Sequence, residues 1–253
     1  LIARGVVAGV EDYGNKMGIP TVNGAVHFHP SYAANPLVYC GCVGLAPARS
    51  HRNAPRAGDR VVVLGGRTGR DGIRGATFSS MKMDDSTGDV AGASVQIGDP
   101  IVQKRALDVL LEARDAGLYN AVTDCGAGGL SSAVGEMAST LGAEIELSRI
   151  GTKYPGLAPW ELWLSEAQER MVLAVPPRHL EAFAALCARF DSEFWDIGTF
   201  RNDGALILTM NGETVLNLSM EFVHGGLPRK HLVAEKPAVV ADGGEKGDGP
   251  NSL

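Results

Sequence analysis

The spacing of apolar residues along this chain predicts helices and strands in alternation, followed by several strands in succession. Apolar positions recur every three or four residues over residues 3–17, which is typical of an amphipathic helix, and a valine-rich run at 60–64 is typical of a buried strand. We expect helices over residues 3–17, 100–116, 130–141, 159–164 and 178–190, and strands over residues 21–28, 37–45, 60–64, 120–123, 171–175, 195–200, 205–210 and 214–218. This order indicates an α/β fold in which a mixed sheet carries helices packed on one side.

Two of these boundaries carry local signals. Asp99 and Pro100 are the residue types that cap a helix and occupy its first position. Asn211 and Gly212 form the dipeptide that most strongly favours a two-residue hairpin turn. The chain therefore ends its ordered part with a pair of antiparallel strands.

Composition divides the chain into four parts. Residues 47–56 are polar and contain prolines, so they are expected to link residues 1–46 to a larger domain at residues 57–235. Residues 236–253 are rich in Gly, Lys and Glu and lack apolar periodicity, which predicts a linker or a disordered tail. Because the chain begins at Leu1 rather than Met, we expect an excerpt of a longer protein or a processed product.

Charge and hydropathy exclude two classes of partner. The 253 residues carry a net charge of −6, which argues against general binding of nucleic acid. No apolar run approaches the ~20 residues that span a bilayer, and no signal peptide is visible, so we expect a cytoplasmic protein with no membrane partner. The cysteines are expected to be free thiols in a reducing compartment. They are Cys40, Cys42, Cys125 and Cys187.

The segment at residues 122–137 combines a carboxylate, a glycine-rich turn and the start of a helix. Asp124 ends the predicted strand, and Gly126, Gly128 and Gly129 follow it. Free backbone N–H groups at a helix N-terminus favour bound anions, and a carboxylate beside such a turn suits a hard cation that bridges protein and phosphate. The alternative is a tight turn from strand to helix in which Asp124 acts only as a local cap.

Other motifs give weaker signals. The glycine segment at residues 65–80 lacks the Gly-Lys-Ser/Thr ending of a P-loop, and residues 126–131 depart from a dinucleotide-binding fingerprint at Ser131. Cys125 has no histidine near it in sequence, which argues against a nucleophile. His27 and His29 could form half of a metal site, although such strand histidines are more often surface residues.

Four ordered motifs resemble one family. They are residues 65–80, Val-Gln-Ile-Gly-Asp-Pro at 95–100, residues 122–137, and Ser-Glu-Ala-Gln-Glu-Arg-Met at 165–171, with support from 12–15, 18–22 and 35–38. Together they resemble formylglycinamide ribonucleotide amidotransferase (phosphoribosylformylglycinamidine synthase) of purine biosynthesis, and most of all its small-type synthetase subunit. The resemblance covers roughly residues 1–235. It implies the C-terminal α/β domain of an aminoimidazole ribonucleotide synthetase-like fold, preceded at residues 1–46 by the tail of an N-terminal α+β domain.

The resemblance also implies an activity and its ligands. Members convert a formamide into an amidine: ATP phosphorylates the amide oxygen, and glutamine-derived ammonia displaces the phosphate. The implied ligands are Mg²⁺, ATP and the ribonucleotide substrate. The implied partners are the rest of the synthetase chain, a glutaminase subunit and a small accessory subunit.

The motifs carry over particular residues. Asp124 matches a magnesium ligand, Gln96 a substrate-contacting glutamine, and Glu166, Ala167 and Gln168 a substrate-contacting Glu-Ser-Gln triplet. Ala167 replaces the serine, so a hydroxyl contact is lost unless the backbone makes it. Each residue has a plainer alternative: Gln96 as a surface amide, and Glu166 and Gln168 as partners of the nearby arginine at position 170.

Two departures leave other functions open. Ala25 stands where the family usually has a glutamate, and the family's catalytic histidine and nucleotide loop have no counterpart, so no catalytic residue is assigned. One alternative is a non-catalytic assembly or binding module of the same fold. Another is a related ATP-dependent synthetase with a different substrate.

Overall fold

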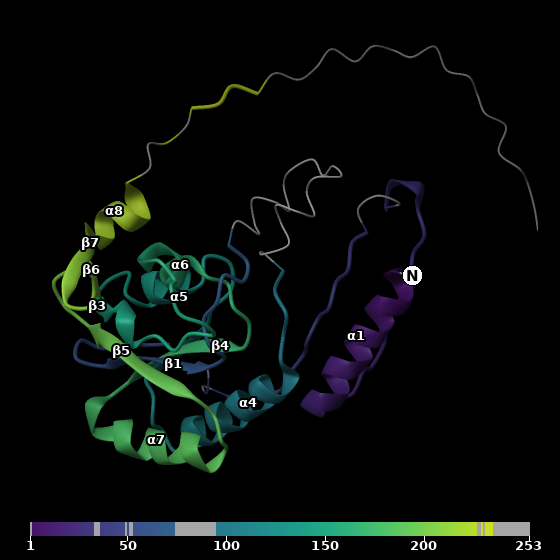
Figure 1. The fold of residues 1–253 in the computed structure, drawn as a ribbon, viewed down its shortest axis with the longest axis horizontal. Helices are drawn as coiled ribbons and strands as arrows, with labels where there is room; N and C mark the ends of the chain where they lie inside the picture. Colours follow the sequence, from purple (N-terminus) through teal and green to yellow (C-terminus); the bar gives the residue numbers. More distant parts are fainter. Residues whose placement is uncertain are drawn as a thin grey trace, which may run out of the picture.

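The computed structural model describes residues 2–32, 36–48, 50, 53–73, 95–226, 229 and 231–234. Most of the regular structure lies between residues 60 and 225 (Figure 1). The helices are α1 (Ile2–Met17), α4 (Pro100–Asp115), α5 (Leu130–Met137), α6 (Pro159–Leu164), α7 (Leu180–Arg189) and α8 (Met220–Gly225), with short 3-10 turns η1 (Pro30–Tyr32), η3 (Leu147–Arg149) and η4 (Pro177–His179). The strands are β1 (Arg60–Gly65), β2 (Ala121–Asp124), β3 (Ala143–Glu146), β4 (Arg170–Val175), β5 (Phe194–Phe200), β6 (Ala205–Met210) and β7 (Glu213–Ser219).

The seven strands form one mixed sheet in the order β2-β4-β1-β5-β3-β6-β7. All neighbouring strands are antiparallel except β3 and β6, which run parallel. The predicted α/β class with a mixed sheet is therefore confirmed. Since β2 and β4 are antiparallel neighbours, the end of β2 lies beside the start of β4, where Asp124 pairs with Met171.

Helices cover both faces of this sheet, so the prediction that they pack on one side is wrong. Alternate residues of a strand point to opposite faces, and β1 is buried on both. Val61 and Val63 pack in a cluster with α5 and α6, whereas Val62 and Leu64 pack in a second cluster with α4 and α7. Figure 1 shows α4 and α7 on one side of the strands and α5 and α6 on the other.

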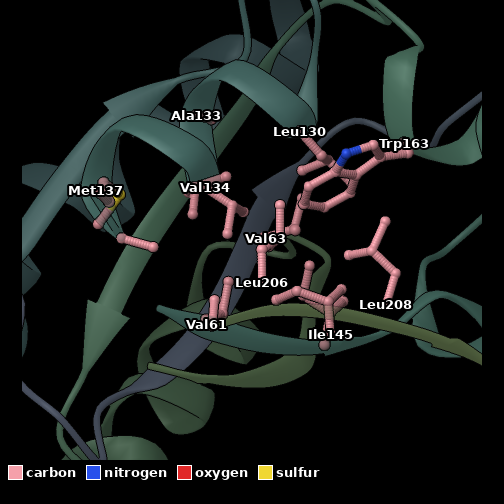
Figure 2. Packing of buried hydrophobic residues seen from close by; sticks show 14 of the residues in the cluster. Val61, Val63, Leu130, Ala133, Val134, Met137, Ile145, Trp163, Leu206 and Leu208 are labelled. Carbon is pink, nitrogen blue, oxygen red and sulfur yellow. The ribbon is translucent and has the colours of Figure 1, made fainter. Parts of the chain in front are cut away.

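The larger cluster lies between the sheet and α5. Figure 2 shows Val134 of α5 and Trp163 of α6 directed toward Val63 of β1, with Leu206 and Ile145 closing the cluster from β6 and β3. All of these side chains are buried. Burying apolar surface at about 25 cal/mol per Å² is the main stabilising contribution of such a layer.

The two predicted boundary signals are confirmed. The Asp99 carboxylate accepts hydrogen bonds from the backbone N–H groups of Ile101 (3.0 Å) and Val102 (3.3 Å) at the start of α4. Asn211 and Gly212 both adopt left-handed backbone conformations, with φ of 54° and 82°, which are the values a type I′ hairpin turn requires.

The helix expected over residues 130–141 ends early, at Met137. Gly142 adopts φ of 99°, and a Cβ on it would lie 2.6 Å from the backbone oxygen of Ala205. The chain must turn here to bring β3, a strand that the sequence pattern did not predict, alongside β6. The four residues after Met137 form that turn instead of a last helical turn.

The strands expected over residues 21–28 and 37–45 are absent, and this prediction is wrong for the described part of these ranges. A strand exists only when its N–H and C=O groups pair with a neighbouring strand. Val22, Val26 and Phe28 are exposed, and no strand lies beside them among the described residues. The helix before them, α1, agrees with the prediction.

Several remaining expectations have mixed outcomes. The four cysteines are free thiols, as predicted. Within the described ranges, no helix is both long enough and apolar enough to cross a membrane. The expected tail at residues 236–253 lies outside the described residues.

Candidate functional site

Three segments that are distant in sequence meet at one end of the strand pair β2 and β4, where β2 ends and β4 begins. One is the loop from Ser165 to Glu169 that leads from α6 into β4, and another is the glycine turn that follows β2. The third is the segment at residues 95–99 before α4. The antiparallel pairing of β2 and β4 brings the first two together, because Cys125 N–H donates to the Arg170 carbonyl (3.1 Å).

A cluster of two amides and one carboxylate lies where these segments meet. The Gln96 Nε2 donates to Glu166 Oε2 (2.8 Å), and the backbone N–H of Gly128 donates to Glu166 Oε1 (3.2 Å). The Gln168 Nε2 donates to the side-chain oxygen of Gln96 and to the Glu166 carbonyl. The structure therefore joins three of the four predicted substrate-binding residues in one hydrogen-bonded cluster.

Arg170 anchors the loop that carries this cluster. Its guanidinium is buried and donates to the carbonyls of Ala167 (2.9 Å) and Ser165 and to the Thr68 hydroxyl (2.9 Å). Burial lowers the pKa of Arg170 below its usual value. Because the guanidinium is engaged with these carbonyls, it does not pair with the Glu166 or Gln168 side chains, and that alternative is wrong.

Glycines allow the close approach of these segments. A Cβ on Gly129 would lie 1.8 Å from the Ser165 carbonyl oxygen, and one on Gly72 would lie 2.4 Å from Gln96 Nε2. Any side chain at either position would push the cluster apart. This close approach explains in physical terms why glycines recur in both motifs.

Ala167 contributes to the loop but not to its exposed surface. Its side chain is fully buried, its N–H donates to the Ser165 hydroxyl (3.2 Å), and its carbonyl accepts from Arg170. Its backbone N–H is therefore already used within the protein. Its assignment as a substrate contact stays a prediction.

Asp124 is exposed at the end of β2, beside the bare glycine turn. A Cβ on Gly126 would lie 3.2 Å from Asp124 Oδ2, so the glycine leaves room next to the carboxylate. No group of three His, Cys, Asp or Glu that could hold a metal occurs in the described part of the chain. Magnesium usually takes one or two protein carboxylates and completes its shell with water and phosphate oxygens, so this site fits a partial shell.

Cys125 is not suited to nucleophilic catalysis. The thiol is buried, and burial raises its pKa to about 11, with the neighbouring Arg170 opposing that shift. A thiol with this pKa is almost entirely protonated near neutral pH. The expectation that Cys125 is not a nucleophile agrees with this environment.

Two residues beside the cluster were missed by sequence reasoning. Glu169 accepts hydrogen bonds at Oε1 from the Tyr13 hydroxyl (2.8 Å) and from the Asp99 N–H (2.9 Å). Glu169 lies in the motif at 165–171 and Tyr13 in the motif at 12–15, but nothing in either motif indicates that these two side chains meet. The only available signal was that a glutamate immediately precedes the arginine that proves to be buried.

Family models match most of the chain. AIR synthase related protein, C-terminal domain, matches residues 56–211, and AIR synthase related protein, N-terminal domain, matches residues 2–46. The phosphoribosylformylglycinamidine synthase subunit PurL of Picrophilus torridus is 39% identical over 226 residues, which cover 88% of this chain and 30% of that protein. The same subunit of Thermoplasma acidophilum is 40% identical over 228 residues, which cover 88% and 30%.

Solved structures agree with these matches. T. maritima PurL complexed with FGAR has a TM-score of 0.73 at 27% identity, covering 90% of this chain and 38% of that one, and the complex with ATP has 0.70 at 26%, covering 92% and 37%. T. maritima PurLQS gives 0.73 at 26%, covering 91% and 37%. The chain spans about a third of the length of the curated relatives it matches. The predicted resemblance is confirmed, and the chain belongs to the AIR synthase related protein family.

Proposed function

We propose that this chain is part of an ATP-dependent ligase that converts formylglycinamide ribonucleotide to formylglycinamidine ribonucleotide with glutamine-derived ammonia. In this proposal the chain supplies contacts to the substrate and to magnesium. Support comes from relatives named as synthase subunits and from the T. maritima PurL complexes with FGAR and with ATP. Since the chain spans about a third of those relatives, other parts of the enzyme complete the active site.

The observation that carries the proposal is the cluster of Gln96, Glu166 and Gln168. A formamide substrate presents both N–H donors and a carbonyl acceptor, and a carboxylate next to amide groups offers partners for each. The Glu166 carboxylate accepts two hydrogen bonds, from Gln96 and from Gly128, which leaves capacity for a substrate donor. The carboxylate and amides are held in place before substrate arrives.

The chain's own groups would orient the reacting amide. The Gln96 amide holds the Glu166 side chain, and the Gln168 amide holds Gln96 in turn. Arg170 holds the loop that carries them, so little reorganisation is needed on binding. Asp124 would hold magnesium, which neutralises phosphate charge when bound. A substrate amide held by such fixed groups reacts faster because its orientation is already determined.

We further propose the ligands and partners that follow from this function. ATP is the second substrate, and Mg²⁺ is the metal. The T. maritima PurLQS structure supports the presence of partners in a complex. We propose that these partners are a glutaminase subunit and a small accessory subunit. A cytoplasmic location fits a biosynthetic ligase.

The second candidate is a non-catalytic binding module of the same fold. The observation that favours it is Ala167: no hydroxyl stands where the family has a serine, and the backbone N–H is already bonded to Ser165. In that case the ribonucleotide could bind without turnover. A synthetase acting on another substrate is a further alternative that the same experiment addresses.

The test is Gln96→Ala in the complete synthetase, with Asn217→Ala on the exposed strand β7 as a matched amide control. Losing one polar contact that strengthens in the transition state costs on the order of 1–3 kcal/mol. We expect titration to show weaker ribonucleotide binding with ATP binding nearly unchanged, and the control to behave as wild type. Equal weakening of ribonucleotide and ATP binding would contradict the assignment of Gln96 as a substrate contact. Ribonucleotide binding without any turnover in the unaltered synthetase would favour the non-catalytic binding module.

A further inference from the structure

One carboxylate oxygen joins three separate parts of the chain. Glu169 Oε1 accepts from the Tyr13 hydroxyl of α1 and from the backbone N–H of Asp99, which caps α4, while Glu169 itself follows Gln168 in the loop. We refer to Glu169, Tyr13 and the Asp99 N–H as the Glu169 clasp. Tyr13 and Glu169 lie 156 residues apart, so the clasp joins α1 to the sheet domain.

The backbone around the clasp is shaped to permit it. Glu169 adopts φ of 58°, a left-handed backbone conformation that residues other than glycine rarely adopt. A Cβ on Gly98 would lie 2.8 Å from Glu169 Oε1 and 2.9 Å from the Tyr13 ring, so only glycine lets these groups meet. A Cβ on Gly65 would lie 2.0 Å from the Glu169 carbonyl oxygen, so Glu169 also packs closely against the end of β1. A strained residue held by two glycine contacts is typical of a functional position.

The clasp lies directly beside the amide cluster. The segment at residues 95–99 carries Gln96, and the loop carries Glu166 and Gln168. These two segments are joined at one end by the Gln96 contacts and at the other by the bond from Asp99 N–H to Glu169. If that second link is lost, Gln96 can shift relative to Glu166, and the donors no longer match the substrate.

The chemistry of the clasp suits a permanent contact. Burial raises the pKa of the Tyr13 phenol above its usual value, and the hydrogen bond to Glu169 raises it further, so the phenol keeps the proton that it donates. Tyr13 is also within hydrogen-bond distance of the Gln103 side chain on α4. The Tyr13 hydroxyl therefore lies between Glu169 of the loop and the first turns of α4.

We propose that Glu169 is a positioning residue: through the Glu169 clasp it sets the register between Gln96 and the loop carrying Glu166 and Gln168, and it makes that register depend on the position of α1. This inference rests on the proposed function, because it concerns the same substrate cluster. Glu169 contacts other protein groups and acts on the substrate only through Gln96 and Gln168.

The first measurement needs no substrate. Hydrogen exchange of the Asp99 amide in the 253-residue chain should become at least about tenfold faster in Glu169→Ala, because its acceptor is lost, and should be largely restored in Glu169→Gln, which keeps an acceptor oxygen. Tyr119→Phe, which removes a phenol hydroxyl elsewhere, should leave it unchanged. An Asp99 amide that exchanges equally fast in Glu169→Ala and wild type would overturn the inference.

The second measurement uses the complete synthetase. Glu169→Ala should raise KM for the ribonucleotide about tenfold, Tyr13→Phe by less, and the double variant no more than Glu169→Ala alone, since both act through one contact. KM for ATP should stay within about twofold. Additive effects, or equal losses for both substrates, would overturn the positioning role. If Gln96→Ala leaves KM unchanged, the proposed function fails, whereas the exchange experiment still tests the clasp.

Discussion

The Glu146 carboxylate fastens the β6–β7 hairpin to β3, and its removal should destabilise the fold in a pH-dependent way. Glu146 accepts from the Thr209 hydroxyl (2.8 Å), from the turn N–H groups of Asn211 (2.9 Å) and Gly212 (3.0 Å), and from Ser148. Hydrogen bonds from Ser148 first, and then from the hairpin, lower the pKa of Glu146 from the ordinary 4.5 to about 2. The charged form is therefore the one that the folded chain holds.

The size of this contribution follows from the shift. Lowering the pKa of Glu146 from 4.5 to about 2 corresponds to roughly 3 kcal/mol of stabilisation of the charged folded state, at about 1.4 kcal/mol per pKa unit. Because Glu146 is only half-buried, solvent screening reduces this to about 1–2 kcal/mol. The unfolded chain takes up its proton near the ordinary pKa, so the contribution is complete above about pH 4.5 and is lost as pH falls toward 2.

Urea unfolding of Glu146→Gln tests this reasoning, with Glu213→Gln at the exposed start of β7 as the control. At pH 7 the Glu146 variant should be less stable than wild type by about 1–2 kcal/mol, and the gap should narrow steadily between pH 4.5 and pH 2.5. The control should stay within about 0.5 kcal/mol throughout. A gap of the same size at pH 7 and pH 2.5 would show that the charge of Glu146 does not hold the hairpin.

Three further changes test the site and its supports. Asp124→Asn should lower the activity of the complete synthetase at least about a hundredfold, with partial rescue by excess magnesium; near-normal activity with unchanged magnesium dependence would reduce Asp124 to a turn residue. Arg170→Lys should cost about 2–3 kcal/mol in urea unfolding, because Arg170 reaches two carbonyls and the Thr68 hydroxyl from three separate nitrogens, and the single nitrogen of lysine cannot reproduce that geometry; a loss under about 0.5 kcal/mol would refute this. The 253-residue chain alone should hydrolyse no ATP and form no amidine, because it spans about a third of its relatives, and steady turnover would contradict this.

Sequence patterns predicted the elements whose signals are local. The Asp99 cap, the helix predicted over residues 3–17 and the Asn211–Gly212 turn depend on neighbouring residues, and the structure agrees with all three. Strand β3 was missed because Glu144 and Glu146 give it a polar appearance. Glu144 forms an ion pair with Arg201, and Glu146 binds the hairpin, so both acidic side chains have partners that lie far away in sequence.

The resemblance indicated which residues belong to the candidate site but not how they are held together, and their role as substrate contacts stays a prediction. Resemblance pointed to Gln96, Glu166 and Gln168, and the structure joins them. Nothing local indicates that Glu169 bonds to Tyr13, because that contact depends on where α1 packs. The expected strand at residues 21–28 failed for a related reason: an alternating pattern shows that a segment can pair, but not that a neighbour is present.

Strands β1 and β4 contribute residues to both hydrophobic clusters, and this affects how the domain unfolds. Successive residues of β1 belong to two different cores, so neither helical layer can separate from the sheet without exposing β1. The two layers should therefore lose their structure in a single step, and the slowest-exchanging amides should lie in β1 and β4. Strand β7, exposed along most of its length at the sheet's edge, is where opening should begin. The candidate site adjoins the start of β4, which places it beside a strand that should be among the last to unfold.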